Sequence, residues 1–159
     1  MTDLAQFLRD RYTERRAIAE AAAAASKARS GDWRYKAGDD RVYAVETFPE
    51  SLPAQRELWT PLVTEAGSYV GDTLDDEIGW HIATNAPADV IADLDAKLAI
   101  VDEHAPGGHY WPGSLQQFCA TCGSGEPNEY PTAWPCRTLR TLARPFAGHP
   151  DHKGEEWAP

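Results

Sequence analysis

The sequence has few cysteines and no long apolar run. Its three cysteines, Cys119, Cys122 and Cys136, cannot all pair within the chain, which argues against the disulfide framework of small secreted domains. No stretch reaches the roughly 18 apolar residues that a membrane-spanning helix needs. The segment after Met1 has acidic residues and arginines where a secretory signal has an apolar core. We therefore expect a cytoplasmic protein without a membrane anchor.

Basic residues are also scarce, with 15 Lys and Arg against 25 Asp and Glu and a net charge of −10 at pH 7. The excess of acid is concentrated in residues 31–104. Because nucleic-acid binding depends on clustered Lys and Arg, we expect no nucleic-acid partner. Arginines at helical spacing in the C-terminal part are typical of a solvated helix face, although they leave nucleic-acid binding as a lesser alternative: Arg137, Arg140 and Arg144.

Familiar catalytic motifs are missing as well. The sequence has no GxSxG elbow, no phosphate-binding glycine loop and no HExxH motif. Serines and acids close to a histidine in sequence are expected by chance in a chain with five histidines. The absence of a motif leaves enzymatic activity uncertain and favours a protein that is not an enzyme.

The length and composition fit one folded domain. The chain has 159 residues, of which 42% are apolar and 25% charged, as in soluble globular proteins. Hydrophobic spacing predicts an α+β fold. Its parts are an N-terminal helix in residues 1–28, a β-rich part in 32–80, and a helical part in 85–159 that contains the three cysteines.

The β-rich part begins with an expected hairpin. Large apolar and polar residues alternate in residues 33–37 and 41–46, around Gly38-Asp39-Asp40. A second strand pair is expected from residues 58–63 and 68–70, and Pro61 would confine its strand to a sheet edge. The acidic residues that follow, between Asp72 and Glu77, lack the spacing of a calcium loop and predict a solvated turn.

A long helix and a short helix are expected to frame the cysteines. Pro87 suits the first turn of a helix that continues to about His104, and His104 extends the apolar stripe that contains Val101. Residues 109–134 show no periodicity and predict a loop held in place by something else. A short helix follows, with Cys136 at its N-terminus, where backbone N–H groups favour a thiolate.

Three cysteines and a histidine predict a zinc site. The two-residue gap between Cys119 and Cys122 lets both sulfurs reach one ion, and Cys136 follows at a spacing typical of small zinc motifs. His104 is the first choice for the fourth ligand and His109 the second. The remaining histidines stay as further choices: His81, His149 and His152. Four protein ligands would make the site structural, whereas free structural cysteines and a Cys119–Cys122 redox pair are the alternatives.

Several motifs resemble an uncharacterised family, a domain of unknown function found in actinobacteria and their phages. These motifs are Leu4-x-x-Phe7-Leu8-x-x-Arg11, His81-Ile82-Ala83 with Pro87, Ala96-Lys97 with His104, Cys119-x-x-Cys122, Pro135-Cys136-x-Thr138-Leu139-Arg140-x-Leu142-Ala143, and His149-Pro150-Asp151 with Trp157. Residues 47–75 depart from the family pattern. The resemblance implies an origin in an actinobacterium or its phage and supports His104 as a ligand, but it implies no activity.

These observations favour a small zinc-stabilised interaction protein, an accessory or regulatory protein whose partner is another protein. The acidic middle segment carries tryptophans such as Trp59, which suits a basic protein surface. The alanine-rich N-terminal helix could also form a homodimer seam. The alternative is a metal-dependent hydrolase or nuclease that uses the histidines around His81, His109 and His149.

Overall fold

The structure is a computed structural model, and it describes residues 3–26, 31–39, 41–47, 57–62, 76–109, 113–122 and 131–159. The chain divides into two compact units. Unit 1 comprises residues 1–14 and 94–159, and unit 2 comprises residues 15–93. The predicted α+β fold is confirmed, while the expectation of a single domain stays a prediction. Within the described ranges, every helix is too short or too polar to span a bilayer.

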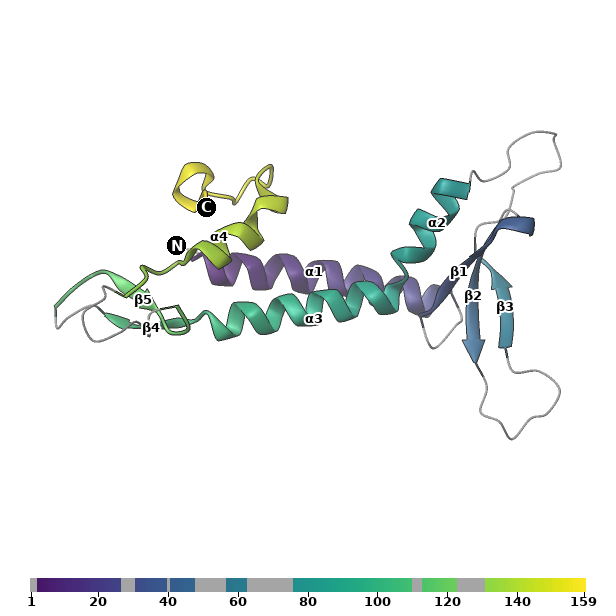
Figure 1. The fold of residues 1–159 in the computed structure, drawn as a ribbon, viewed down its shortest axis with the longest axis horizontal. Helices are drawn as coiled ribbons and strands as arrows, with labels where there is room; N and C mark the ends of the chain where they lie inside the picture. Colours follow the sequence, from purple (N-terminus) through teal and green to yellow (C-terminus); the bar gives the residue numbers. More distant parts are fainter. Residues whose placement is uncertain are drawn as a thin grey trace. The chain divides into compact units, whose positions relative to one another are not determined.

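The described residues contain four α-helices and five strands, whose arrangement along the chain can be followed in Figure 1. The α-helices are α1 (Leu4–Ala25), α2 (Asp76–Thr84), α3 (Pro87–Glu103) and α4 (Arg137–Ala143). The strands are β1 (Trp33–Lys36), β2 (Arg41–Thr47), β3 (Glu57–Pro61), β4 (Pro106–His109) and β5 (Gln117–Cys119). Three short 3-10 helices complete the described elements: η1 (Ala37–Asp39), η2 (Arg144–Phe146) and η3 (Gly154–Trp157).

Unit 2 contains an antiparallel sheet in the order β1-β2-β3. The predicted hairpin is confirmed, because β1 pairs with β2 and Tyr35 lies opposite Val42. Strand β3 pairs with β2 from the other side, so that Trp59 lies opposite Val45. Among the described strands, β3 lies at the edge of the sheet, where the missing N–H of Pro61 does not interrupt the pairing.

Helix α2 covers the sheet at Tyr35. The ring of Tyr35 packs with Val42 and Ala83 in a buried cluster, and its hydroxyl donates a hydrogen bond of 2.6 Å to Asp76 Oδ1. Gly79 makes the close approach possible, since a Cβ at this position would lie 2.2 Å from the ring. The sheet and α2 thus form the core of unit 2.

One boundary in unit 2 differs from the expectation, and the second expected strand pair stays a prediction. Residues 76–80 belong to α2 rather than to the β-rich part, because Gly79 inside the helix accommodates the ring of Tyr35. The strand in residues 57–61 pairs with β2, and its expected partner in residues 68–70 lies outside the described residues. Of the expected acidic turn, Asp76 and Glu77 form the first turn of α2, and residues 72–75 are not described.

Unit 1 has an aromatic core between the start of α1 and the C-terminal elements. Leu4, Leu8 and Leu139 are fully buried. The ring of Phe7 packs against Phe146 and Trp157, with centroid distances of 6.0 and 5.0 Å. These contacts confirm the amphipathic N-terminal helix and the short helix expected after Cys136.

A two-stranded hairpin follows α3 in unit 1, where the sequence predicted a loop. Strand β4 pairs with β5, with a register shift between Pro106 and Gly108. A Cβ at Gly107 would lie 2.6 Å from the ring of Phe118, so glycine is needed here to let the ring pack on the backbone. The glycines that predicted a helix stop therefore also belong to a strand.

Candidate metal centre

Four elements of unit 1 bring the predicted ligands together. His104 follows the last residue of α3, and Cys119 is the last residue of β5. Cys122 lies in the turn after β5, and Cys136 occupies the N-cap position of α4. The side chains gather although 32 residues separate the first from the last. A bound ion at this point would link α3, the hairpin and α4.

The four ligand atoms have the spacing of a tetrahedral site. The Nδ1 atom of His104 lies 3.3 Å from Cys119 Sγ, 3.4 Å from Cys122 Sγ and 3.4 Å from Cys136 Sγ. All four atoms lie within 4.8 Å of one another. Bond lengths of about 2.1 Å to nitrogen and 2.3 Å to sulfur place tetrahedral N and S ligands about 3.6 Å apart. The residues therefore fit a metal ion, which they could hold together.

Hydrogen bonds from neighbouring residues fix the ligands in place. The indole Nε1 of Trp134 donates to the carbonyl oxygen of His104 at 3.0 Å, and the hydroxyl of Thr121 donates to the carbonyl of Glu103. The backbone N–H of Cys122 points to Cys119 Sγ at 3.5 Å. These bonds hold the end of α3 against the turn after β5 and against Trp134, and they preorganise the cluster.

Cys136 lies in an environment that favours its thiolate. Burial opposes ionisation, but the backbone N–H groups of Leu139 and Thr138 and the thiols of Cys119 and Cys122 outweigh it, so the pKa of Cys136 lies below its ordinary value. These N–H groups belong to the first turn of α4, where the helix dipole also favours negative charge. The helix N-terminus thus favours the thiolate of Cys136, as expected from the sequence.

The surroundings of Cys122 disfavour its thiolate. Desolvation, hydrogen bonding with Cys119 and the negative charge of Cys136 raise the pKa of Cys122 to about 12. Three thiolates this close would repel one another, and a bound cation would offset that repulsion. The donor set therefore suits a cation.

The other histidines do not join this cluster. Across the described ranges, the four residues are the one group of three or more metal-ligating side chains at ligand distance. His109 lies in β4 and His81 in α2. His149 contacts the guanidinium of Arg11 and packs edge-on against Phe7 at 5.6 Å. The structure thus places His104 in the cluster and the alternatives elsewhere.

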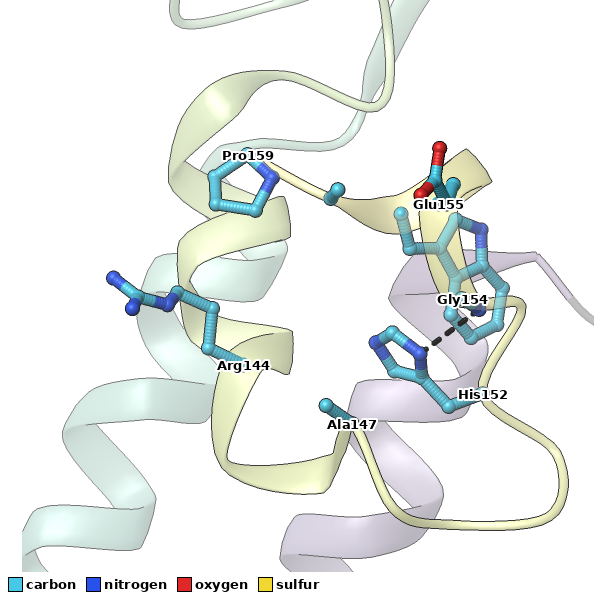
Figure 2. A pocket seen from close by; sticks show the side chains of 8 residues that line it. Arg144, Ala147, His152, Gly154, Glu155 and Pro159 are labelled. Atoms are coloured by element: carbon cyan, nitrogen blue, oxygen red, sulfur yellow. Dashed lines mark hydrogen bonds between the residues drawn. The ribbon is translucent and has the colours of Figure 1, made fainter.

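A pocket of about 490 Å³ lies in the C-terminal segment of unit 1. Its lining includes Arg144, His152, Glu155 and Trp157 and none of the four clustered residues. Figure 2 shows the imidazole of His152 turned toward Gly154, whose backbone N–H donates to His152 Nδ1 at 3.1 Å. The pocket is therefore separate from the candidate metal centre, and its histidine serves to shape the chain end.

Together these features define an α+β protein with a candidate metal centre of three cysteines and one histidine. The chain belongs to DUF6221, a family of unknown function whose sequence model matches residues 1–159. The resemblance to a domain of unknown function is confirmed at this level. No match was found among curated proteins or among solved structures.

Sequence reasoning identified the four clustered residues but missed those that support them. Trp134 and Thr121 lie in the stretch expected to be a loop, where no periodicity marks their role. Trp134 stands two residues before Cys136, and this proximity is the one available signal. A tryptophan beside a ligand could have suggested a second layer of hydrogen bonds.

Proposed function

We propose that this protein is a small zinc-stabilised interaction protein in which the metal has a structural role. One observation carries the proposal: a single imidazole nitrogen lies at nearly equal distances from three sulfurs, 3.3 to 3.4 Å. Four protein ligands complete a tetrahedral shell and leave no coordination position for water or substrate. Thiolate and imidazole ligands in this geometry favour zinc over harder cations.

Elemental analysis of the purified protein tests the metal. We expect one zinc ion per chain, and we expect His104→Ala to lose most of the zinc affinity. His109→Ala is the matched control, because His109 was the next choice for the fourth ligand and lies outside the cluster; it should bind zinc like the unmodified chain. A protein that fails to retain zinc, or a His104→Ala variant with unchanged affinity, contradicts the proposal.

The partner we propose is a protein with a basic and apolar surface. In unit 2, exposed apolar side chains stand next to acidic ones: Trp59 is 36% exposed beside Glu57, and Trp80 is 54% exposed in a helix that begins with Asp76 and Glu77. The indole of Trp59 is already held in place, because its Nε1 donates to Glu57 at 3.1 Å. Preordered aromatic side chains with acidic neighbours suit a basic partner.

Affinity capture with matched variants tests this surface. Trp59→Ala and Trp80→Ala should each weaken binding of the captured partner, and added salt should weaken it further, since charge pairs are screened. Leu115→Ala is the control, because Leu115 is another exposed apolar side chain but belongs to unit 1. Equal loss in all three variants would argue against a surface on unit 2.

We extend the proposal to self-association and origin. Ile18 is exposed on α1 and lines an apolar pocket of about 290 Å³ together with Ala19, Ala22 and Trp33, which supports a homodimer seam through the N-terminal helix. Light scattering should then report a dimer that Ile18→Glu converts to a monomer.

The reduced cysteines that zinc requires suit the cytoplasm of an actinobacterium or of its phage-infected cell.

A further inference from the structure

Solvent reaches the three cysteine ligands to very different degrees. Cys119 and Cys136 are 0% and 1% exposed, whereas Cys122 lies at the surface in the turn after β5. An oxidant dissolved in water can therefore meet one of the three sulfurs directly. Because oxidation of cysteine follows thiolate character and exposure, and a metal-bound cysteine is a thiolate, Cys122 is the first sulfur to react.

A second thiolate stands ready to complete the oxidation. Cys119 Sγ lies 3.5 Å from the backbone nitrogen of Cys122, and the two residues share one turn with two residues between them. All ligand atoms lie within 4.8 Å, so Cys119 can approach an oxidised Cys122 without rearranging α3 or α4. Cys136 is the N-cap residue of α4 and lies outside the turn that carries Cys122. It is therefore less suited than Cys119 to form a disulfide with Cys122.

We propose that Cys122 is an oxidation site for peroxides and that Cys119 resolves it, so that oxidation releases the zinc ion. The Cys122 thiolate attacks one peroxide oxygen, which forms a sulfenic acid and releases hydroxide. The Cys119 thiolate then attacks the sulfenic sulfur and displaces a second hydroxide. Two thiolates and one hydrogen peroxide thus become one disulfide and two hydroxide ions.

Release of the ion follows from the loss of ligands. After oxidation, His104 and Cys136 are the remaining ligands of the four, and two ligands do not make a closed zinc site. The link between α3, the hairpin and α4 then opens, while the sheet of unit 2 contains none of the reacting groups. This inference rests on the proposed zinc site, and it adds a peroxide-sensitive control of that site.

The experiment adds hydrogen peroxide to the zinc-loaded full chain, with a coloured zinc indicator in solution and peptide mapping by mass spectrometry. We expect one zinc ion released per chain, together with a disulfide between Cys119 and Cys122 that a thiol reductant reverses. Zinc retained at peroxide concentrations that oxidise free cysteine overturns the inference. A disulfide that contains Cys136 also overturns it.

Two variants with equal ligand numbers separate the roles of the sulfurs. Cys122→His keeps a zinc ligand but removes the exposed thiolate, so release should be at least about tenfold slower. Cys136→His is the matched comparison, because it changes one ligand in the same way but keeps both reacting cysteines, and it should release zinc at least about tenfold faster than Cys122→His. Equal rates in the two variants contradict the assignment of Cys122.

The outcome also separates this inference from the proposed function. A chain that binds no zinc before peroxide is added overturns both. A chain that binds zinc and keeps it in peroxide overturns the oxidation site alone, and the structural zinc remains. The disulfide mapping on the unmodified chain decides the question even if a histidine variant fails to fold.

Discussion

In unit 2, three strands pair in a continuous register and a helix covers them, whereas unit 1 has a two-stranded hairpin with a register shift and a helix of 7 residues. Regular hydrogen bonding and one buried cluster hold the first arrangement together. In the second, side chains from the end of α3, from β5 with its following turn, and from the N-cap of α4 converge on one point. The comparison suggests that ligation replaces regular pairing where the backbone offers little of it.

The largest expected effect comes from removing the proposed zinc ion. Cys122→Ser, Cys136→Ser or a strong chelator should destabilise unit 1 severely, since structural zinc supplies on the order of 10 kcal/mol in small motifs. Hydrogen exchange should rise in residues 94–109, 113–122 and 131–159 but stay low in β1 and β2. Unchanged thermal stability in chelator would remove the basis for the contrast between the units.

A smaller effect, confined to unit 2, is expected from Gly79→Ala. The new Cβ would lie 2.2 Å from the ring of Tyr35, and overpacking of this kind costs about 1 to 3 kcal/mol. Urea unfolding measures the loss, and zinc content should not change. Gly38→Ala is the control, because nothing lies within 4 Å of the Cβ that it would add. Equal losses in both variants would mean that the contact with Tyr35 does not matter.

Single hydrogen bonds provide a finer test in each unit. Tyr35→Phe removes the bond to Asp76 in unit 2, and Trp134→Phe removes the bond to the carbonyl of His104 in unit 1. Each should cost about 1 kcal/mol, measured as a shift of the urea midpoint. We expect only Trp134→Phe to weaken zinc binding as well. A change of zinc affinity in Tyr35→Phe would show that the units are coupled.

The smallest effect concerns pH and again belongs to unit 2. A hydrogen bond from Lys36 lowers the pKa of Asp39, and one from Arg34 lowers the pKa of Glu57. A lowered folded-state pKa gives stability above the unfolded value of about 4, which is lost as the pH falls through the folded-state value. Urea midpoints should therefore decrease below about pH 4. Lys36→Met and Arg34→Met should make the urea midpoint change less with pH. If the midpoint changes with pH as in the unmodified chain in both variants, the prediction is wrong.

Helices and strands whose apolar residues recur at one regular spacing were predictable from the sequence. The helices around Phe7 and Leu94, and the hairpin of β1 and β2, follow from apolar spacing and a short turn. The cysteines and His104 were predictable as a group because their chemistry limits the choices. In each case, one local rule was sufficient.

The missed elements depend on contacts between distant residues. Gly79 looks like a poor helix residue until the ring of Tyr35 is placed above it, and Gly107 looks like a helix stop until Phe118 packs on it. Strand β3 pairs with β2 across residues that carry strong turn signals. Local propensity contains none of this information, because the partner lies far along the chain.

Cys136 has two roles, because it is the N-cap residue of α4 and also belongs to the candidate metal centre. A serine or aspartate at such a position stabilises a helix to a constant degree. A zinc-bound cysteine instead makes helix formation depend on the supply of the ion, and each tenfold change in free zinc above the dissociation constant shifts the balance by about 1.4 kcal/mol. The first turn of α4 would therefore form or fray with the metal status of the cell.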